Sequence, residues 1–310
     1  MIEVSGLTKS YGSHLAINDL NFTINKGEVV GFLGPNGAGK STTMKILTGF
    51  MAATHGTAKV CGYDVFESPI EVKKRIGYLP ETPPVYLDML VFDYLEYVAQ
   101  LKGVEKSKIK SSVNRAIEQT HLGSVQKRMI QNLSKGFKQR VGIAQALVSD
   151  PEVLILDEPT VGLDPKQVAE IRDLIKELKG KHTIILSTHI LPEVQSTCER
   201  IIIINKGQIV AQDTLLNLSK IKSGSRKVKL KVRNSNANIS ATLKGIAGVL
   251  SVEKQNGGVE WTIDTEDNDE VIEQIAMQVI QSKWGLSEIT SAKADLEDIF
   301  IKLTYGQAEV

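Results

Sequence analysis

Cysteines, long apolar runs and an excess of either charge are scarce in this 310-residue sequence. Its two cysteines, Cys61 and Cys198, lie far apart and have no second cysteine or histidine at metal-ligand spacing, which argues against a disulfide framework or a structural zinc site. No apolar run approaches the roughly 18 residues that a membrane-spanning helix requires, and the first residues lack the apolar stretch of a signal peptide. The net charge of +1 argues against binding nucleic acid over a broad surface. We therefore expect a soluble protein of the reducing cytoplasm, with no nucleic acid as partner.

Short apolar strands alternate with helical patterns up to about residue 215, as is typical of a doubly wound α/β sheet. Between residues 81 and 150 the strand signals stop and helical periodicity dominates, as in VFDYLEYVAQLKG (91–103). We predict a helical insert at about 82–148. The segments that carry the α/β prediction are strands at 28–34, 153–159, 183–189 and 200–210 and a helix at 165–180.

A Ser, Lys and Gly stretch at 219–227 predicts a linker, and with it two domains at 1–220 and 221–310. Beyond the linker, alternating and helical segments follow one another in the order β-α-β-β-α-β, which is the split-βαβ arrangement of a small α+β domain. We interpret this domain as a regulatory or dimer-stabilising accessory, by analogy of shape. A last helix is expected to place Leu296, Ile299, Phe300 and Leu303 on one face.

The basic run RKVKLKVR (226–233) admits two interpretations. It could bind nucleic acid or lipid headgroups. Alternatively, it is a strand whose apolar residues point inward and whose lysines keep a sheet edge in solvent and prevent aggregation. We favour the strand.

A phosphate-binding loop follows the strand at 28–34. The segment GPNGAGKS (34–41) matches the pattern G-x4-G-K-[ST] at every fixed position and precedes a helical pattern. Its glycines allow backbone N–H groups to turn toward the β-phosphate. Lys40 can reach the β- and γ-phosphates, and the Ser41 hydroxyl can bind Mg²⁺. A turn that merely connects strand and helix is a weak alternative. The predicted nucleotide-binding residues are Gly34, Pro35, Asn36, Gly37, Ala38, Gly39, Lys40, Ser41 and Thr42.

Two acidic residues, Asp157 and Glu158, end the buried strand at 153–159. Adjacent side chains on a strand point to opposite sides, so the two carboxylates need not share one task. Asp157 suits a hold on Mg²⁺, and Glu158 suits a general base that polarises water in line with the γ-phosphate. His189 ends another apolar strand, at the edge where this sheet class binds its ligands. From its position alone, a structural role and a catalytic role for His189 remain equally open.

These segments together resemble the nucleotide-binding subunits of ABC transporters over essentially the whole chain. The resemblance depends on the phosphate loop, LSKGFKQR (133–140) at the signature position, LILDEPTVGLDP (154–165) and STH (187–189), all in the family's order. The LSKG variant and the ending LEDIF (296–300) are similar to the ATPases of ABC-2-type exporters, of the multidrug and gliding-motility-associated sort.

The resemblance implies an ATPase with Mg²⁺ that works as a dimer, in which each subunit completes the other's site. Ser134 and Gly136 would contact ATP held by the second ATP-binding subunit, and Asp164 would lie at the same seam. Tyr11 would stack on adenine, and His189 would hold the γ-phosphate. Lys135 and Phe137 depart from the usual LSGGQ, whereas Ser134 and Gly136 are kept.

Glu81 is a second departure, because many relatives have glutamine at that position. A carboxylate there could still bind Mg²⁺, so we predict that Glu81 belongs to the metal site with Ser41 and Asp157. The loop that follows, TPPVYLDML (82–90), and the helical insert are the expected contact with separate transmembrane permease subunits. The chain would then lie at the inner face of the cell membrane.

Two other classes of function fit the sequence less well. A soluble ABC ATPase acting on ribosomes or DNA usually has two nucleotide domains in one chain or long coiled coils, and neither feature is found in this sequence. A GTPase is a weaker alternative, since NKGQ (205–208) lacks the aspartate of an N-K-x-D motif. The sequence therefore favours the energy-supplying subunit of an exporter.

Overall fold

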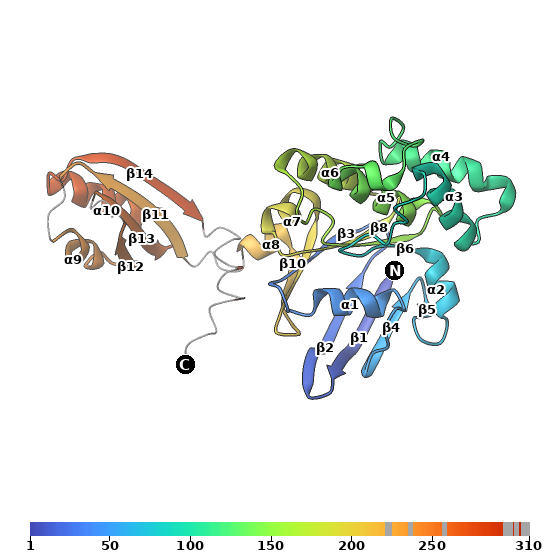
Figure 1. The fold of residues 1–310 in the computed structure, drawn as a ribbon. Coiled ribbons are helices and arrows are strands. Elements are labelled where there is room, and N and C mark those ends of the chain that lie inside the picture. The colour runs from blue at the N-terminus through green and yellow to red at the C-terminus, as the bar shows by residue number, and fades with distance from the viewer. Residues whose placement is uncertain (221–224, 235–237, 256–258, 294–299, 301–303, 305–310) are drawn as a thin grey trace. The chain divides into compact units, whose positions relative to one another are not determined.

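The computed structural model describes the chain except residues 221–224, 235–237, 256–258, 294–299, 301–303 and 305–310 (Figure 1). Contacts divide the chain into two compact units, Met1–Thr214 and Leu215–Val310. Each unit has its own apolar core. None of the helices in the described part of the chain has the length and apolar character that crossing a membrane requires.

A six-stranded sheet forms the centre of the first unit, in the order β10-β9-β3-β8-β7-β6. Its strands pair in parallel except for β10, which is antiparallel to β9. The inner strands are buried on both faces and therefore consist of continuous apolar residues. The predicted α/β fold is confirmed. The strands are β3 (Val29–Leu33), β6 (Ile76–Leu79), β7 (Val153–Asp157), β8 (Thr183–Thr188), β9 (Arg200–Asn205) and β10 (Gln208–Thr214).

The single strand predicted at 200–210 is wrong. The chain turns back at Lys206 and Gly207, so this segment forms β9 and β10 as a hairpin. Both turn residues have positive φ, 46° and 77°. A two-residue turn with positive φ at both positions matches the twist of the flanking strands, which explains the reversal.

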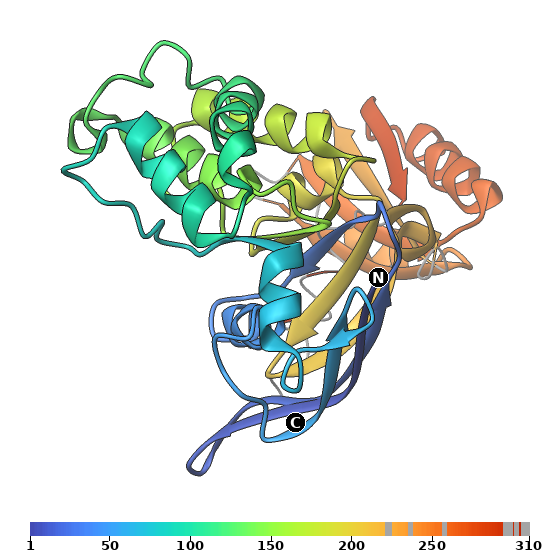
Figure 2. The ribbon, with the colours of Figure 1, turned by 90° about the vertical axis from the view of Figure 1, so that its right-hand side faces the viewer.

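A second, antiparallel sheet lies beside the first, in the order β2-β1-β4-β5. Helix α1 (Lys40–Leu47) lies between the two sheets, and its Met44 belongs to the same core as Phe22 of one sheet and Phe32 of the other (Figures 1 and 2). This sheet was not predicted from the sequence. Its strands are β1 (Ile2–Tyr11), β2 (His14–Ile24), β4 (His55–Val60) and β5 (Tyr63–Asp64).

The predicted helical insert is present between β6 and β7 and has a core of its own. Helix α5 packs closely on the large sheet: a Cβ on Gly77 of β6 would lie 2.1 Å from the carbonyl oxygen of Ala146. The helices of the insert are α3 (Val91–Leu101), α4 (Ile109–Gln119) and α5 (Lys135–Leu147), with short 3-10 turns at Lys106–Lys108 and Ile130–Asn132, whereas α2 (Pro69–Arg75) precedes β6. After β7 come α6 (Pro165–Leu178) and α7 (Leu191–Thr197).

The second unit confirms the predicted β-α-β-β-α-β order. Its sheet runs β12-β13-β11-β14 with every pair antiparallel. After α8 (Leu215–Lys220), its elements are β11 (Ser225–Val232), α9 (Ile239–Lys244), β12 (Val249–Lys254), β13 (Glu260–Glu266), α10 (Asp269–Gln281) and β14 (Leu286–Lys293). Of the residues predicted to share one face of a final helix, Phe300 is described and buried. Leu296, Ile299 and Leu303 lie outside the described residues.

The basic run at 226–233 forms β11, as the alternation predicts, with Val228 and Leu230 buried. The prediction that it is an edge strand is wrong, because β11 pairs with β13 on one side and β14 on the other. Two of its basic side chains form ion pairs instead. Arg226 pairs with Asp267 at 2.6 Å, and Lys231 pairs with Glu260 at 2.6 Å.

Candidate functional site

The phosphate loop connects β3 to α1 and needs its glycines. A Cβ on Gly34 would lie 2.3 Å from the carbonyl oxygen of Ile204, and Gly39 has φ +107°. Gly39 caps α1 without any side-chain hydrogen bond, so the first N–H groups of the helix face the loop. Lys40 is 5% exposed, and its Nζ donates to the carbonyls of Gly34 and Pro35 at 2.8 and 3.2 Å. The carbonyl groups of the loop therefore surround the ammonium group of Lys40.

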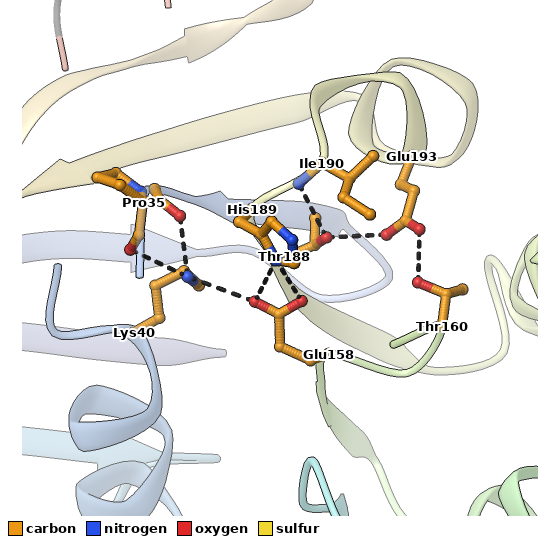
Figure 3. A network of polar contacts seen from close by, with 9 residues as sticks. Pro35, Lys40, Glu158, Thr160, Thr188, His189, Ile190 and Glu193 are labelled. Carbon is orange, nitrogen blue, oxygen red and sulfur yellow. Dashed lines mark hydrogen bonds and ion pairs between the residues drawn. The ribbon is translucent and has the colours of Figure 1, made fainter. Parts of the chain in front are cut away.

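Glu158 lies at the end of β7 and meets two of the predicted residues (Figure 3). Its carboxylate is 3.3 Å from Lys40 Nζ, and its two oxygens are 2.9 and 3.1 Å from His189 Nδ1. Because an ionised carboxylate only accepts hydrogen bonds, the imidazole N–H is the donor. Glu158 is 7% exposed and has φ +49°, a conformation that costs a non-glycine residue energy and is concentrated at functional sites.

Asp157 is buried beside Glu158 but makes different contacts. Its side chain is 2% exposed, and its Oδ1 has no hydrogen-bond partner among the described residues. Burial raises the pKa of the Asp157 carboxyl; the Ser187 and Ser41 hydroxyls lower it in part, and the nearby Glu158 and Glu81 carboxylates raise it further. An orphaned carboxylate oxygen close to a serine hydroxyl and a second acid fits a hard cation.

No group of three or more His, Cys, Asp or Glu side chains within the described ranges could hold a metal ion by itself. A cation at Asp157 would therefore need oxygen ligands of other kinds as well. Phosphate oxygens and water are the usual additional ligands of Mg²⁺ in nucleotide sites. The residues present fit a Mg²⁺ ion that enters together with a nucleotide.

Most of the predicted residues surround one cavity of ≈ 450 Å³. Gly34, Pro35 and Ala38 belong to the loop but do not line the cavity, and Gly34 and Pro35 act through the carbonyls that hold Lys40. The predicted residues that line it are Tyr11, Asn36, Gly37, Gly39, Lys40, Ser41, Thr42, Glu81, Glu158 and His189.

His14, Ala16 and Val161 also line this cavity and were not predicted. His14 pairs with Tyr11 across the β1-β2 hairpin, so the two rings lie at the same end of the antiparallel sheet. Tyr11 is 46% exposed. The tight turn between Tyr11 and His14 was the sequence signal that could have found His14.

Ser134 and Gly136 line a different cavity, of ≈ 230 Å³. Ser134 caps α5, with its Oγ accepting from the N–H of Phe137 at 3.4 Å. Asp164 caps α6 in the same manner, accepting from the N–H of Gln167 at 2.9 Å. The side chain of Gln167 in turn fills the space beside Gly136, where a Cβ would lie 2.6 Å from its Oε1. Two capped helix N-termini therefore lie side by side, in a cavity separate from the phosphate loop.

Lys135, the residue that departs from the usual signature, contacts the loop before α6. A Cβ on Gly162 would lie 2.1 Å from Lys135 Nζ, and Gly162 has φ +66°. Within one chain, the signature segment and the loop at 160–164 are therefore in direct contact.

Comparisons with known proteins agree with this geometry. The family model described as ABC transporter matches residues 17–161. An uncharacterized ABC transporter ATP-binding protein of Bacillus subtilis, YhcH, is 34% identical over 98% of this chain and 96% of its own length. The bacitracin transport ATP-binding protein BcrA of Bacillus licheniformis is 32% identical over 99% and 98%.

A solved structure is similar to part of this chain. It is the dimeric post-hydrolysis state of the ATP-binding cassette MJ0796 bound to ADP and Pi, with a TM-score of 0.63 and 25% identity. It covers 69% of this chain and 99% of the cassette. The two relatives, in contrast, match over both units.

Proposed function

This chain belongs to the ABC transporter family, as the ATP-binding and ATP-hydrolysing subunit of an exporter, and from that premise we propose how its residues bind and hydrolyse ATP. Two copies close head to tail over two ATP molecules, and hydrolysis reopens them. Separate membrane subunits receive this movement at the inner face of the membrane. The observation that carries the proposal is the separation of the phosphate loop and the Ser134 segment into two cavities of one chain.

Each ATP binds at the loop between β3 and α1. Its β- and γ-phosphates take hydrogen bonds from the loop N–H groups and from Lys40, and its adenine stacks on the half-exposed ring of Tyr11. The γ-phosphate competes with the Glu158 carboxylate for the Lys40 ammonium, which now lies 3.3 Å from that carboxylate. Nucleotide entry thereby loosens the hold of Lys40 on Glu158.

Glu158 then acts as the general base for the attacking water, and His189 orients it. The imidazole N–H that now donates to both carboxylate oxygens keeps Glu158 at the cavity wall. Its other ring nitrogen is left to face the γ-phosphate. Proton transfer by a positioned base typically contributes ~10²–10⁴-fold to the rate.

Mg²⁺ would be held by Ser41 and Asp157, with Glu81 as a third oxygen ligand. Bound there, Mg²⁺ would supply positive charge against the phosphate oxygens. The Oδ1 of Asp157 has no hydrogen-bond partner in the described part of the chain, which supports this assignment, because a buried carboxylate oxygen without a partner is otherwise costly.

The second copy supplies Ser134 and Gly136 to the ATP of the first. The N-terminus of α5 carries a partial positive charge that suits a γ-phosphate, and Asp164 lies next to it through Gln167. To move a dimer from 1:99 open to 99:1 closed, ATP must favour the closed form by about 5.5 kcal/mol. Two triphosphates bridged by charge-assisted hydrogen bonds from both copies are a sufficient source.

The membrane subunits dock in an apolar groove beside the helical insert. The groove has a volume of ≈ 390 Å³, and Phe50 in it is 74% exposed. It continues into a second hollow with Tyr86, Tyr97 and Leu101, the last of which is 68% exposed. Exposed apolar and aromatic residues that adjoin one another mark protein interaction sites. The groove is lined by Lys45, Phe50, Tyr78, Pro80, Pro84, Lys102, Gln145 and Ala146.

The Glu158→Gln variant tests the function directly. It should bind ATP with wild-type affinity, because Lys40 and the loop are intact, and should hydrolyse it at least ~100-fold more slowly, because the base is lost. Single-turnover hydrolysis and equilibrium binding with the full-length chain measure both. Hydrolysis by Glu158→Gln at the wild-type rate would show that the base is another group.

A further inference from the structure

Glu193 in α7 joins the two segments that carry Glu158 and His189, although it does not line the nucleotide cavity (Figure 3). Its Oε1 accepts from Thr160 Oγ1 at 2.5 Å, and its Oε2 accepts from Thr188 Oγ1 at 2.8 Å. Thr160 comes two residues after Glu158, and Thr188 comes directly before His189. One carboxylate therefore holds both segments by their hydroxyls.

The same hydroxyl of Thr188 holds the other side of His189. Its Oγ1 accepts from the N–H of Ile190 at 3.1 Å while it donates to Glu193. The residues before and after His189 are thus tied to one oxygen atom. This fixes the His189 backbone, and with it the ring that donates to Glu158.

The helix that carries the Glu193 carboxylate packs tightly on the central sheet. The next residue, Val194, lies directly against β3, where a Cβ on Gly31 would be 2.3 Å from its Cγ1. Glu193 is 2% exposed, Thr160 4% and Thr188 0%. A carboxylate buried to this degree is stable only with hydrogen-bond donors, and the two hydroxyls supply one to each oxygen.

Thr160 also begins the loop that leads to α6 and to the cavity lined by Ser134 and Gly136. The N–H of Leu163 donates to the Thr160 carbonyl at 3.2 Å, and Asp164 then caps α6 beside Gly136. The N–H of Val161, between them, donates to the Glu158 carbonyl at 3.2 Å. Movement of this loop by a second copy would therefore reach Glu158 and His189 through Thr160.

We propose that Glu193 is a positioning residue for ATP hydrolysis. It sets the spacing of Glu158 and His189 and ties both to the loop at 160–164. The proposal rests on the proposed function, which gives Glu158 and His189 their roles. Misplacement of a reacting group by about 1 Å can cost ~100-fold in rate, so a hydrogen-bond clamp of this kind has a measurable effect.

Thr160→Val removes the hydroxyl and keeps the shape of the side chain, whereas Thr160→Ser keeps the hydroxyl. We expect Thr160→Val to lower kcat for ATP by roughly tenfold or more and to leave the Kd for ADP within about twofold of wild type. Thr160→Ser should recover most of the lost kcat. The measurements are steady-state hydrolysis and calorimetric ADP binding with the full-length chain.

Thr120→Val is the matched control. Thr120 is fully buried in the helical insert, and its Oγ1 donates to the Ala116 carbonyl at 2.7 Å, so the variant also loses one buried hydroxyl bond. It should show a similar change in Tm with a wild-type kcat. Glu193→Gln should lower kcat as well, and adding Thr160→Val to it should cost less than Thr160→Val alone, because the bond between Thr160 and Glu193 is already altered.

The proposal is overturned if Thr160→Val keeps the wild-type kcat, if Thr160→Ser is as slow as Thr160→Val, or if the Thr120→Val control loses as much kcat as Thr160→Val does. Failure of the proposed function gives a different result, namely a Glu158→Gln variant that hydrolyses ATP like wild type.

Discussion

At the scale of single residues, the site contains several groups that lower the stability of the folded chain. Asp157 is a buried carboxylate with an oxygen that lacks a partner among the described residues, and Glu158 has positive φ beside it. A protein commonly loses stability where its active site needs buried charge or strain. We therefore expect removal of the Asp157 charge to stabilise the nucleotide-free chain while it abolishes function.

Asp157→Asn tests this through its dependence on pH. Because the pKa of Asp157 is raised by burial in the native state, the folded chain binds more protons than the unfolded chain between the ordinary and the raised pKa, and stability falls as pH rises through that range. The amide that replaces the carboxyl in the variant does not titrate. The Tm advantage of the variant should be largest above the raised pKa and should shrink as pH falls through it.

The same variant should lose Mg²⁺-dependent hydrolysis, as the wild type should when Mg²⁺ is chelated. Thermal unfolding of the nucleotide-free full-length chain across pH, beside Asp173→Asn as a control for an exposed acid, measures the stability effect. A Tm advantage that grows toward acid pH would contradict the cause given for the pKa shift.

The sequence was sufficient to predict that the loop at 34–41 and Glu158 line one cavity, because both follow an apolar strand directly. It could not reveal the contact between His189 and Glu158, since the two residues are 31 positions apart. Nor could it distinguish Glu193 from an exposed acid in the first turn of a short helix. That requires knowing that Gly31 admits Val194 and so brings α7 onto the sheet.

At the scale of elements, we propose that the helical insert presents the surface on which a membrane subunit docks. Phe50 lies in this groove, after the C-terminal end of α1, so an added charge there leaves the phosphate loop untouched. Phe50→Glu should keep ATP hydrolysis by the isolated chain within about twofold, because no core contact is lost. It should greatly weaken co-purification with the cognate membrane subunit.

Phe66→Glu is the matched control, since Phe66 is 54% exposed and does not line the groove. It should co-purify with the membrane subunit as wild type does. Equal co-purification of Phe50→Glu and Phe66→Glu would place the docking surface elsewhere.

Elements whose pattern is local were predicted well, whereas elements that depend on pairing were not. The apolar strand at 28–34 and the helix at 165–180 have clear periodicity, and both are present as β3 and α6. The turn at Lys206 and Gly207 is short and lies within an apolar stretch, so periodicity alone did not separate β9 from β10. The position of β11 inside its sheet depends on β14, which comes much later in the chain.

At the scale of the whole molecule, the residues that we assign to the ATP site line two separate cavities. Lys40 and Glu158 line one cavity, and Ser134 and Gly136 line another. The dimeric cassette that resembles part of this chain has ADP and Pi bound. We infer that a chain with its two half-sites apart can hydrolyse ATP only after it meets a second chain.

Mixing two inactive variants tests this claim most directly. Lys40→Ala cannot hold the phosphates, whereas Ser134→Asp keeps the cap of α5, since aspartate is a good N-cap residue, and repels the γ-phosphate of the other copy. We predict that each alone is inactive and that an equal mixture regains about a quarter of wild-type activity, because half of the dimers are mixed and each has one intact site. A mixture as inactive as its two components, with both variants folded and Ser134→Asp still binding ATP, would contradict the account.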